Sequence, residues 1–405
     1  MFVMPIWRRN LFVCWFGMFL TGIGMSQIAP ILPLYIKQLG VQDAGSVSAV
    51  SGLAFGVTFI VSAIFSPIWG IAADKFGRKP MLLRASLGMA LVIGCMGFAH
   101  NVYVLIGLRL LQGVITGYST ACTTLIATQT DKEHSGWALG TLSTANTSGS
   151  LIGPSVGGLI AERFGLQNSF FVTGGLMMIA FATTLLFVKE TFVRQEKKTS
   201  KMKELWSSVP EKSLTLTLFL TALVLTASLY SIEPILTVYV SDLSRNMGHV
   251  ALIAGVVFSA SGLAQVLAAP RLGKLSDRAG PHKVLLGALL VGGIVFIPQA
   301  FVSDPWQLTA LRFVFGLAAG GLSPSINTLL KRITPSSITG RVFGFNVAAG
   351  YLGVFGGSIL GGQVASWLGP RYVFFMTGAL LLLNAGWVYF KVYKKLQLPT
   401  LEGKN

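Results

Sequence analysis

Apolar stretches of about 20 residues recur along the whole chain, with short polar segments between them. A helix of roughly this length crosses the hydrocarbon core of a bilayer. The pattern therefore predicts an all-α polytopic membrane protein with twelve transmembrane helices. We expect the spans near residues 11–36, 47–69, 80–99, 102–128, 137–161, 168–188, 213–241, 248–270, 283–301, 305–330, 341–366 and 370–391.

Composition agrees with this pattern. Hydrophobic residues make up 53% of the 405 residues and charged residues only 11%. A soluble protein of this length needs far more surface charge, so the lipid bilayer is the expected surrounding.

The net charge of +17 would suit nucleic-acid binding, but its distribution indicates a membrane topology instead. If Arg8 and Arg9 lie inside and the chain changes side at each span, one side collects most of the Lys and Arg residues. This is the positive-inside bias. It predicts cytoplasmic termini and gives no reason to expect a nucleic-acid partner.

The chain contains an internal repeat of about half its length. "APILPLYI" (29–36) returns as "EPILTVYV" (233–240), and "GGLIAERFGLQNSFFVTGGL" (157–176) returns as "GGQVASWLGPRYVFFMTGAL" (361–380). The repeat predicts two pseudo-symmetric six-helix halves, 1–188 and 213–405, joined by a basic cytoplasmic linker, 189–212. Such halves are typical of transporters, whose site between the repeats opens alternately to each side.

The motifs resemble those of the major facilitator superfamily over about residues 7–393. "GIAADKFGRKPMLL" is similar to the family signature between spans two and three, and "LRLLQG" to its span-four signature. "GSLIGPSVGG" (149–158) is similar to the span-five signature of the twelve-span drug–proton antiporter branch. Within that branch the chain resembles bacterial multidrug pumps of the fluoroquinolone type.

The resemblance implies the major facilitator fold and proton-coupled multidrug efflux by alternating access. It implies amphipathic, often cationic drugs and protons as partners, with no cofactor besides the proton gradient. It also implies a bacterial inner or plasma membrane and a functional monomer.

In the family, the acid of the first signature closes the cytoplasmic side by facing a helix N-terminus. The resemblance therefore implies gating roles for Asp74, Gly77 and Arg78, with Asp131 completing a charge network. We expect Asp74 in a short loop, and Asp277 in a loop as well. Asp277 is its repeat mate, but Pro281 and His282 replace the basic residues there, so the second contact is expected to be weaker.

In span five, Gly149, Gly153 and Gly157 recur every four residues and leave one helix face without side chains. We expect this face to pack tightly on a neighbour. Pro154 frees a backbone carbonyl, so a bend is expected as the moving part. Tight packing without a hinge is the alternative.

Glu233 is the only acid that falls inside a predicted span. Apolar surroundings favour the neutral form of a carboxylate, which suits a proton carrier. Arg109 lies in span four, where a guanidinium is costly and usually faces the protein interior. The resemblance links Arg109 to proton transfer. For Arg109 and its repeat mate Arg312, the alternative is that the side chain snorkels to the interface. For Glu233, the alternative is a structural carboxyl group that stays neutral.

A drug cavity in this family is mostly aromatic and apolar, with few polar groups. The candidates are Phe19, Gln27, Tyr35, Tyr118, Asn146, Tyr230, Glu233, Tyr239, Phe258, Asn327 and Asn346. Ordinary packing is the alternative for each of them.

Export of a native metabolite, sugar or lipid is the nearest alternative function. Few buried amides are expected, which favours an apolar substrate over a sugar. The sequence has no HExxH or GxSG motif and no pair of carboxylates within a span, so we expect no enzyme. A membrane sensor would need a soluble domain that the 189–212 loop is too short to hold.

Overall fold

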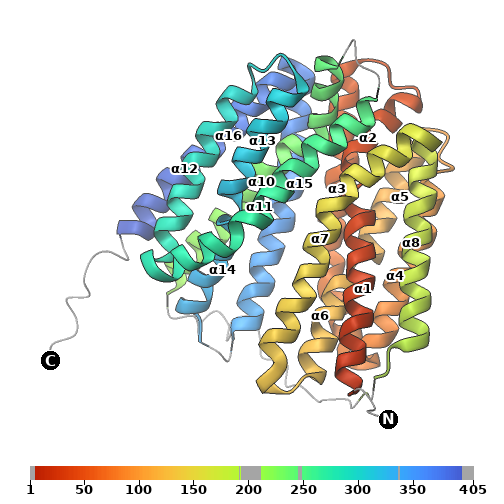
Figure 1. Ribbon diagram of the computed structural model, residues 1–405, viewed down its shortest axis with the longest axis vertical. Helices are drawn as coiled ribbons and strands as arrows, with labels where there is room; N and C mark the ends of the chain where they lie inside the picture. Colours follow the sequence, from red (N-terminus) through yellow and green to blue (C-terminus); the bar gives the residue numbers. More distant parts are fainter. Residues whose placement is uncertain (1–4, 191, 193–210, 245–248, 336–337, 395–405) are drawn as a thin grey trace. The chain divides into compact units, whose positions relative to one another are not determined.

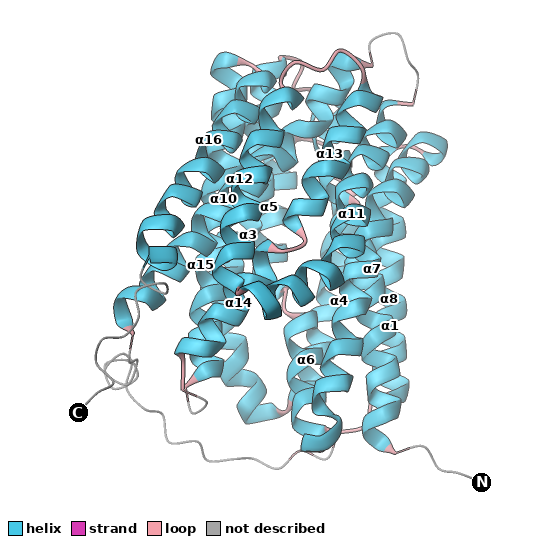
Figure 2. Cartoon of the chain, turned by 60° about the vertical axis from the view of Figure 1, so that its left-hand side comes forward, coloured by secondary structure: helices cyan, strands magenta, loops and turns pink. Residues whose placement is uncertain are grey.

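The computed structural model describes residues 5–190, 192, 211–244, 249–335 and 338–394. These residues form helices joined by short connections, and no strand occurs among them (Figure 2). The prediction of an all-α protein is confirmed.

The helices follow one another along the chain as labelled in Figure 1. The bounds are α1 Ile6–Ser26, α2 Ile28–Gln38, α3 Ala44–Phe76, α4 Arg78–Met96, α5 Val102–Ile115, α6 Tyr118–Gln129, α7 Lys132–Phe164, α8 Leu166–Phe187, α10 Lys212–Leu243, α11 Val250–Ala279, α12 Pro281–Gln299, α13 Pro305–Ala319, α14 Leu322–Ile333, α15 Thr339–Leu368 and α16 Pro370–Val388. A short π-helical turn, Tyr389–Tyr393, continues α16.

Eleven helical segments of the described chain are long and apolar enough to cross a membrane. The remaining long helix is α7, which covers the predicted span 137–161. Its glycines, serines and threonines lower its hydropathy. The chain is thus an all-α polytopic membrane protein, and α7 lies where the fifth span was predicted.

Three predicted spans are not single helices, which corrects the sequence-based expectation. Span one breaks at Gln27, span four at Thr116 and Gly117, and span ten at Gly320 and Gly321. In span one, a proline at position 30 cannot donate a backbone hydrogen bond to the preceding turn. In span four, the glycine has φ +128°, which a β-carbon would oppose.

Asp74 and Asp277 lie in helices, so the expectation that they lie in loops is wrong. Asp74 belongs to the last turn of α3 and Asp277 to the last turn of α11. Both carboxylates are exposed. The helices continue past the apolar stretch because water solvates the polar side chains there while the backbone keeps its helical bonds.

At the other end of α3, the Ser46 backbone N–H holds the pKa of the Asp43 N-cap below its usual value.

The chain forms two compact units. The first contains residues 1–197 and 233–259, and the second contains residues 198–232 and 260–405. The division of the sequence into halves 1–188 and 213–405 stays a prediction. Most of the linker 189–212 lies outside the described residues.

Within the first unit, α7 packs on α1 along a seam of glycines. A β-carbon on Gly149 would collide with the carbonyl of Phe19, and one on Gly153 would lie 2.6 Å from the carbonyl of Ile23. A β-carbon on Gly157 would collide with the Cβ of Gln27. The expected tight packing of this face is confirmed, and the neighbour is span one.

The second unit repeats this seam between α10 and α15. Gly353 lies against the Leu223 carbonyl and Gly357 against the Ala227 carbonyl. These contacts match those of the first seam after a shift of 204 residues on both partners. The internal repeat therefore appears both in the amino-acid sequence and in the backbone contacts between helices.

A polar contact next to each seam is also repeated. Gln27 Nε2 donates to Thr173 Oγ1 on α8. In the second unit, Ser231 Oγ and Thr377 Oγ1 lie 2.7 Å apart. Both positions are again shifted by 204 residues, so each unit ties its first span to its sixth with a buried hydrogen bond.

The opposite face of α7 packs on the start of α11, within the first unit. Gly158 approaches the Ala251 carbonyl, and Gly255 approaches the Pro154 carbonyl. Glu162 Oε1 lies 2.7 Å from His249 Nδ1 at the end of this contact. Both faces of α7 are thus used for close backbone approach.

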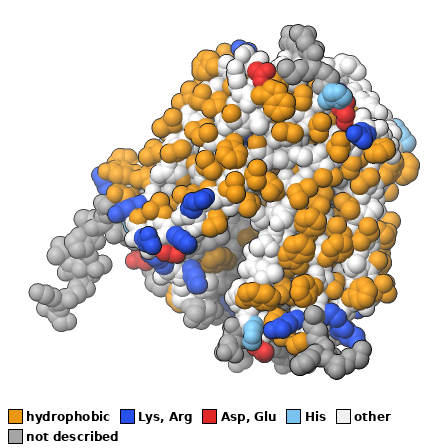
Figure 3. All heavy atoms as spheres, in the orientation of Figure 1, with side chains coloured by type: hydrophobic (Ala, Val, Ile, Leu, Met, Phe, Trp, Pro, Cys, Tyr) orange, Lys and Arg blue, Asp and Glu red, His pale blue; other side chains and the backbone are white. Residues whose placement is uncertain are grey.

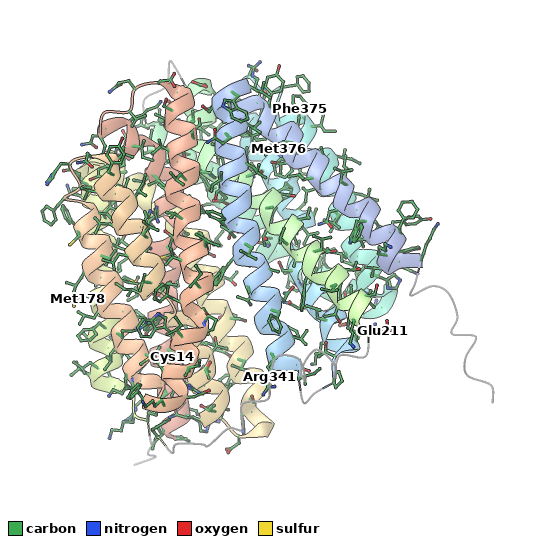
Figure 4. All side chains as sticks on the ribbon, turned by 180° about the vertical axis from the view of Figure 1, so that it is seen from behind. Cys14, Met178, Glu211, Arg341, Phe375 and Met376 are labelled. Carbon is green, nitrogen blue, oxygen red and sulfur yellow. The ribbon has the colours of Figure 1, made fainter. Side chains whose placement is uncertain are left out.

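Large apolar side chains cover much of the visible outer surface of the helices, and charged side chains gather mainly near helix ends (Figure 3). Tyr103 and Leu383 are 86% and 70% exposed. In Figure 4, Met178 lies on the outside of the first unit, whereas the buried Cys14 lies among its helices. Exposed apolar residues of this kind are expected where lipid replaces water.

The seam predicts the effect of adding one methyl group. We expect Gly149→Ala to lower stability by about 1–3 kcal/mol, because the new β-carbon meets backbone that cannot rotate away. Gly140→Ala on the same helix is the control, since nothing lies within 4 Å of its β-carbon position. Thermal unfolding in detergent measures both; equal midpoints would contradict the seam.

Candidate functional site

The interior of span four carries a buried guanidinium. Arg109 is 3% exposed, and its Nη1 donates to Gln112 Oε1 at 3.1 Å. Gln112 Nε2 in turn lies 3.2 Å from the Met25 sulfur on α1. Arg109 Nε and Nη2 have no hydrogen-bond partner among the described residues. This leaves a buried cation with spare N–H donors, which an anion or a carboxylate could accept.

Burial decides one question that the sequence left open. Arg109 and its repeat mate Arg312 are both only 3% exposed. Side chains that snorkel would carry their guanidinium groups to water. Both arginines are therefore interior residues, while the role of Arg109 in proton transfer stays a prediction.

The first signature forms a charged turn between α3 and α4. Arg78 Nη2 lies 2.5 Å from Asp74 Oδ1, so the two predicted gating side chains pair with each other. Gly77 joins the helices with φ +95°. A β-carbon there would also lie 3.0 Å from a Glu190 oxygen, so glycine is required both by conformation and by space.

Glu190 closes this turn from the far end of α8. Its two carboxylate oxygens accept the backbone N–H groups of Arg78 at 2.8 Å and Lys79 at 2.7 Å. These are the first residues of α4, where unpaired N–H groups and the helix dipole attract an anion. Lys79 Nζ completes the contact by donating to the Val188 carbonyl at 2.7 Å.

A buried amide ties three helix ends together beside this turn. Asn10 Nδ2 donates to Gln129 Oε1 and to the Lys189 carbonyl, both at 2.6 Å. Asn10 Oδ1 accepts the Lys189 N–H at 3.1 Å. The ends of spans one, four and six are therefore fixed to one another.

Two other gating candidates lie apart from this network. Asp131 is the N-cap residue of α7 and its side chain makes no capping bond. Neither Asp131 nor Asp277 forms an ion pair with a described residue.

Pro154 lies inside the continuous helix α7, with its carbonyl against Gly255.

Glu233 lies inside α10, directly before Pro234, and is partly buried. Its position in a long apolar helix matches the sequence-based expectation. Its role as proton carrier stays a prediction.

Several predicted cavity residues are buried between helices. Tyr35 OH donates to the Met96 carbonyl at 2.8 Å, and Tyr118 OH lies 2.9 Å from Thr184 Oγ1. Tyr239 and Phe258 are also buried. For the first two, these internal bonds describe packing, so they are weaker candidates for drug contact.

The other candidates are more open. Asn146 is exposed on α7, and Tyr230 is partly buried. Phe19 is also partly buried and stacks on Trp15 with ring centres 5.5 Å apart. Asn327 and Asn346 come together in the second unit, with an N–O distance of 3.5 Å. A shared substrate site for the candidates stays a prediction.

Sequence reasoning missed Asn10, Glu190 and Gln112. Asn10 could have been found as the amide that opens an apolar span directly after two arginines. Glu190 gave no such signal, because its partners lie 111 and 112 residues earlier in the chain.

Two copies of one helical plan, embedded in lipid and joined into one chain, define a class of membrane transporters. The chain belongs to the Major Facilitator Superfamily: the family's sequence model matches residues 14–256 and 218–404.

Curated relatives agree over almost the full length. The chain is 44% identical over 380 residues to "Multidrug resistance protein MdtG" of Salmonella paratyphi B, and equally to the protein of that name from Citrobacter koseri. In each case the match covers 94% of this chain and 94% of the relative.

Solved structures show the same fold at low sequence identity. A bacterial homologue of the human lysosomal transporter Spinster, inward-facing and occupied, has a TM-score of 0.81 at 13% identity and covers 96% of this chain and 97% of its own. The nucleoside transporter NupG has a TM-score of 0.77 at 14% identity and covers 96% and 99%. At these identities the likeness concerns the fold alone.

The Glu190 contact predicts a stabilising cap. We expect Glu190→Ala to lower stability by about 1–2 kcal/mol, because two N–H groups at the start of α4 lose their acceptor. Asp131→Ala is the control, since Asp131 also stands at a helix start but makes no capping bond. Thermal unfolding of both variants gives the comparison. An equally large loss of stability in Asp131→Ala would show that the hydrogen bonds of Glu190 do not stabilise the start of α4.

Proposed function

We propose that this chain exports amphipathic, often cationic drugs across a bacterial inner or plasma membrane in exchange for protons. The observation that carries the proposal is the 44% identity over 94% of the chain to proteins named for multidrug resistance. Transport rather than catalysis is the activity this supports. We propose that the proton gradient is the energy source, that no cofactor is needed, and that the monomer functions alone.

Two groups are proposed to couple protons to transport. Glu233 is an acid inside an apolar helix, and Arg109 is a buried cation with spare N–H donors. A carboxylate in such a setting accepts a proton readily, and it can then lose that proton where water or a cation reaches it. Drug and proton would compete for Glu233 in this mechanism.

Asp74 and Arg78 are proposed to act as a gate at the cytoplasmic side. Their ion pair is only partly exposed, with side-chain exposure of 47% for Asp74 and 14% for Arg78. Glu190 holds the start of α4 beside it. We propose cytoplasmic termini from the Lys and Arg distribution, and this turn would then lie inside the cell.

Export of a native lipid is the alternative that the interior leaves open. Buried amides of the described residues, such as Gln27, Gln112 and Asn384, are already bonded within the chain, which favours an apolar substrate over a sugar.

Glu233→Gln tests the coupling. In inside-out vesicles with an imposed pH gradient, we expect the wild type to accumulate ethidium and dissipate the gradient. The variant should do both at least about tenfold more slowly, because an amide cannot carry the proton. Equal rates would make Glu233 a structural residue. A wild type that ignores ethidium and neutral drugs would favour the native lipid.

Asp74→Asn tests the gate. We expect turnover to fall several-fold with little change in drug affinity, because the substitution removes the ion pair with Arg78 and leaves the interior unchanged. The repeat mate Asp277→Asn should have a smaller effect, since Asp277 forms no ion pair with a described residue. Saturation curves of drug transport separate the two parameters. Equal effects at both positions would contradict a special role for the first turn.

A further inference from the structure

Span four is interrupted at a place where its free carbonyl groups are held by two other helices. α5 ends at Ile115 and α6 begins at Tyr118. The last carbonyl groups of a helix have no partner within it. In a membrane protein such groups must be satisfied by other parts of the chain, since lipid offers no donor.

Two side chains supply the donors. Trp69 Nε1 on α3 donates to the Val114 carbonyl at 2.6 Å. Arg84 Nη2 on α4 donates to the Thr116 carbonyl at 3.1 Å. The break is thus bonded to two separate helices.

The same two side chains also contact each other. The Arg84 guanidinium carbon lies 3.5 Å from the centre of the Trp69 ring. Such stacking orients a guanidinium, and its positive charge suits the C-terminal end of α5, where the helix dipole is negative. Arg84 Nε and Nη1 have no hydrogen-bond partner among the described residues. A cation within a membrane span costs free energy. Here the guanidinium bonds the Thr116 carbonyl and stacks on the Trp69 ring.

The break lies close to the buried charge of the candidate site. The last helical bond of α5 runs from the Thr116 N–H to the Gln112 carbonyl at 3.0 Å. Gln112 holds Arg109, and the Arg109 carbonyl accepts from Thr58 Oγ1 on α3 at 3.0 Å. α3 therefore fixes α5 both at Arg109 and, through Trp69, at its end.

Span ten offers a comparison within the same chain. It also breaks, at Gly320 and Gly321. A shift of 203 residues places Leu272 at the position of Trp69 and Gly287 at the position of Arg84. Neither Leu272 nor Gly287 has a side chain that can donate a hydrogen bond. There the Gly321 N–H bonds the Ala318 carbonyl at 3.1 Å, which tightens the turn with backbone alone.

We propose that Trp69 and Arg84 are positioning residues for transport, which hold span four open at Thr116 and Gly117 and so fix the place of Arg109. The proposal rests on the transport function proposed above. Without the two donors, the carbonyl groups before the break would take the N–H groups after it as helical partners. Span four would become one continuous helix, and Arg109, together with Gln112, would leave its place beside α1.

The test compares Arg84→Leu, Arg84→Lys and Trp69→Phe with wild type. Arg84→Leu removes the donor and the charge, and Trp69→Phe keeps the ring but removes the N–H. Arg84→Lys keeps the charge without the planar fork. Leu272→Met at the second break is the matched control, since it changes no hydrogen bond.

Two measurements are made on each protein in detergent or vesicles. Backbone hydrogen exchange follows the amides of residues 117–120. Transport of ethidium, driven by a pH gradient, gives kcat and KM. For Arg84→Leu we expect about tenfold greater protection of these amides and a kcat at least tenfold lower, with KM changed less than threefold. Arg84→Lys should recover part of the rate, and the control should match wild type.

Unchanged or lower amide protection together with a wild-type kcat in Arg84→Leu would overturn the proposal. If Arg84→Leu does not fold, Trp69→Phe decides by the same two criteria, with smaller effects expected. If the wild type transports no drug, the proposed function fails. The exchange measurement would still show whether the two residues keep span four broken.

Discussion

A helix in lipid has to satisfy its own backbone, because the surroundings offer no hydrogen-bond donors or acceptors. This constraint explains where the described helices are regular and where they are not. Continuous helices without proline, such as α8, need nothing from their neighbours and are free to pack by shape. Broken spans need partners. In span four, the side chains of Trp69 and Arg84 meet that need, whereas in span ten the backbone tightens instead.

The same constraint makes glycine the residue of close contact. Since the backbone is already satisfied, two helices gain by bringing their backbones together, and small residues, glycine above all, allow this. The seams α1–α7 and α10–α15 repeat this contact at matching positions. Polar side chains beside them, such as Ser231 and Thr377, add a buried bond without charge. Most charges of the described residues lie near helix ends, whereas Arg109 and Arg312 are buried within their helices.

Local patterns were enough to predict the spans, the repeat and the glycine seam. The twelve apolar stretches follow from length and hydropathy, and the face formed by Gly149, Gly153 and Gly157 follows from helical spacing. What the sequence did not reveal depends on partners far along the chain. The break at Gly117 is stable only because donors arrive from α3 and α4, and Glu190 matters only because α8 ends beside the start of α4. Glu233 was found by its isolation in an apolar stretch, but nothing in that stretch says what it contacts.

The seam between α1 and α7 has a consequence for motion. Gly149 and Gly153 of α7 each lie in a notch formed by the backbone of α1, and Ser26 also lines the notch of Gly153. Two surfaces that interlock at every turn cannot slide past each other without lifting apart. Spans one and five should therefore move as one rigid body, and so should their mates α10 and α15. Rearrangement of this chain would then proceed by rotation of helix pairs, with bending confined to the broken spans, and not by shear within a pair.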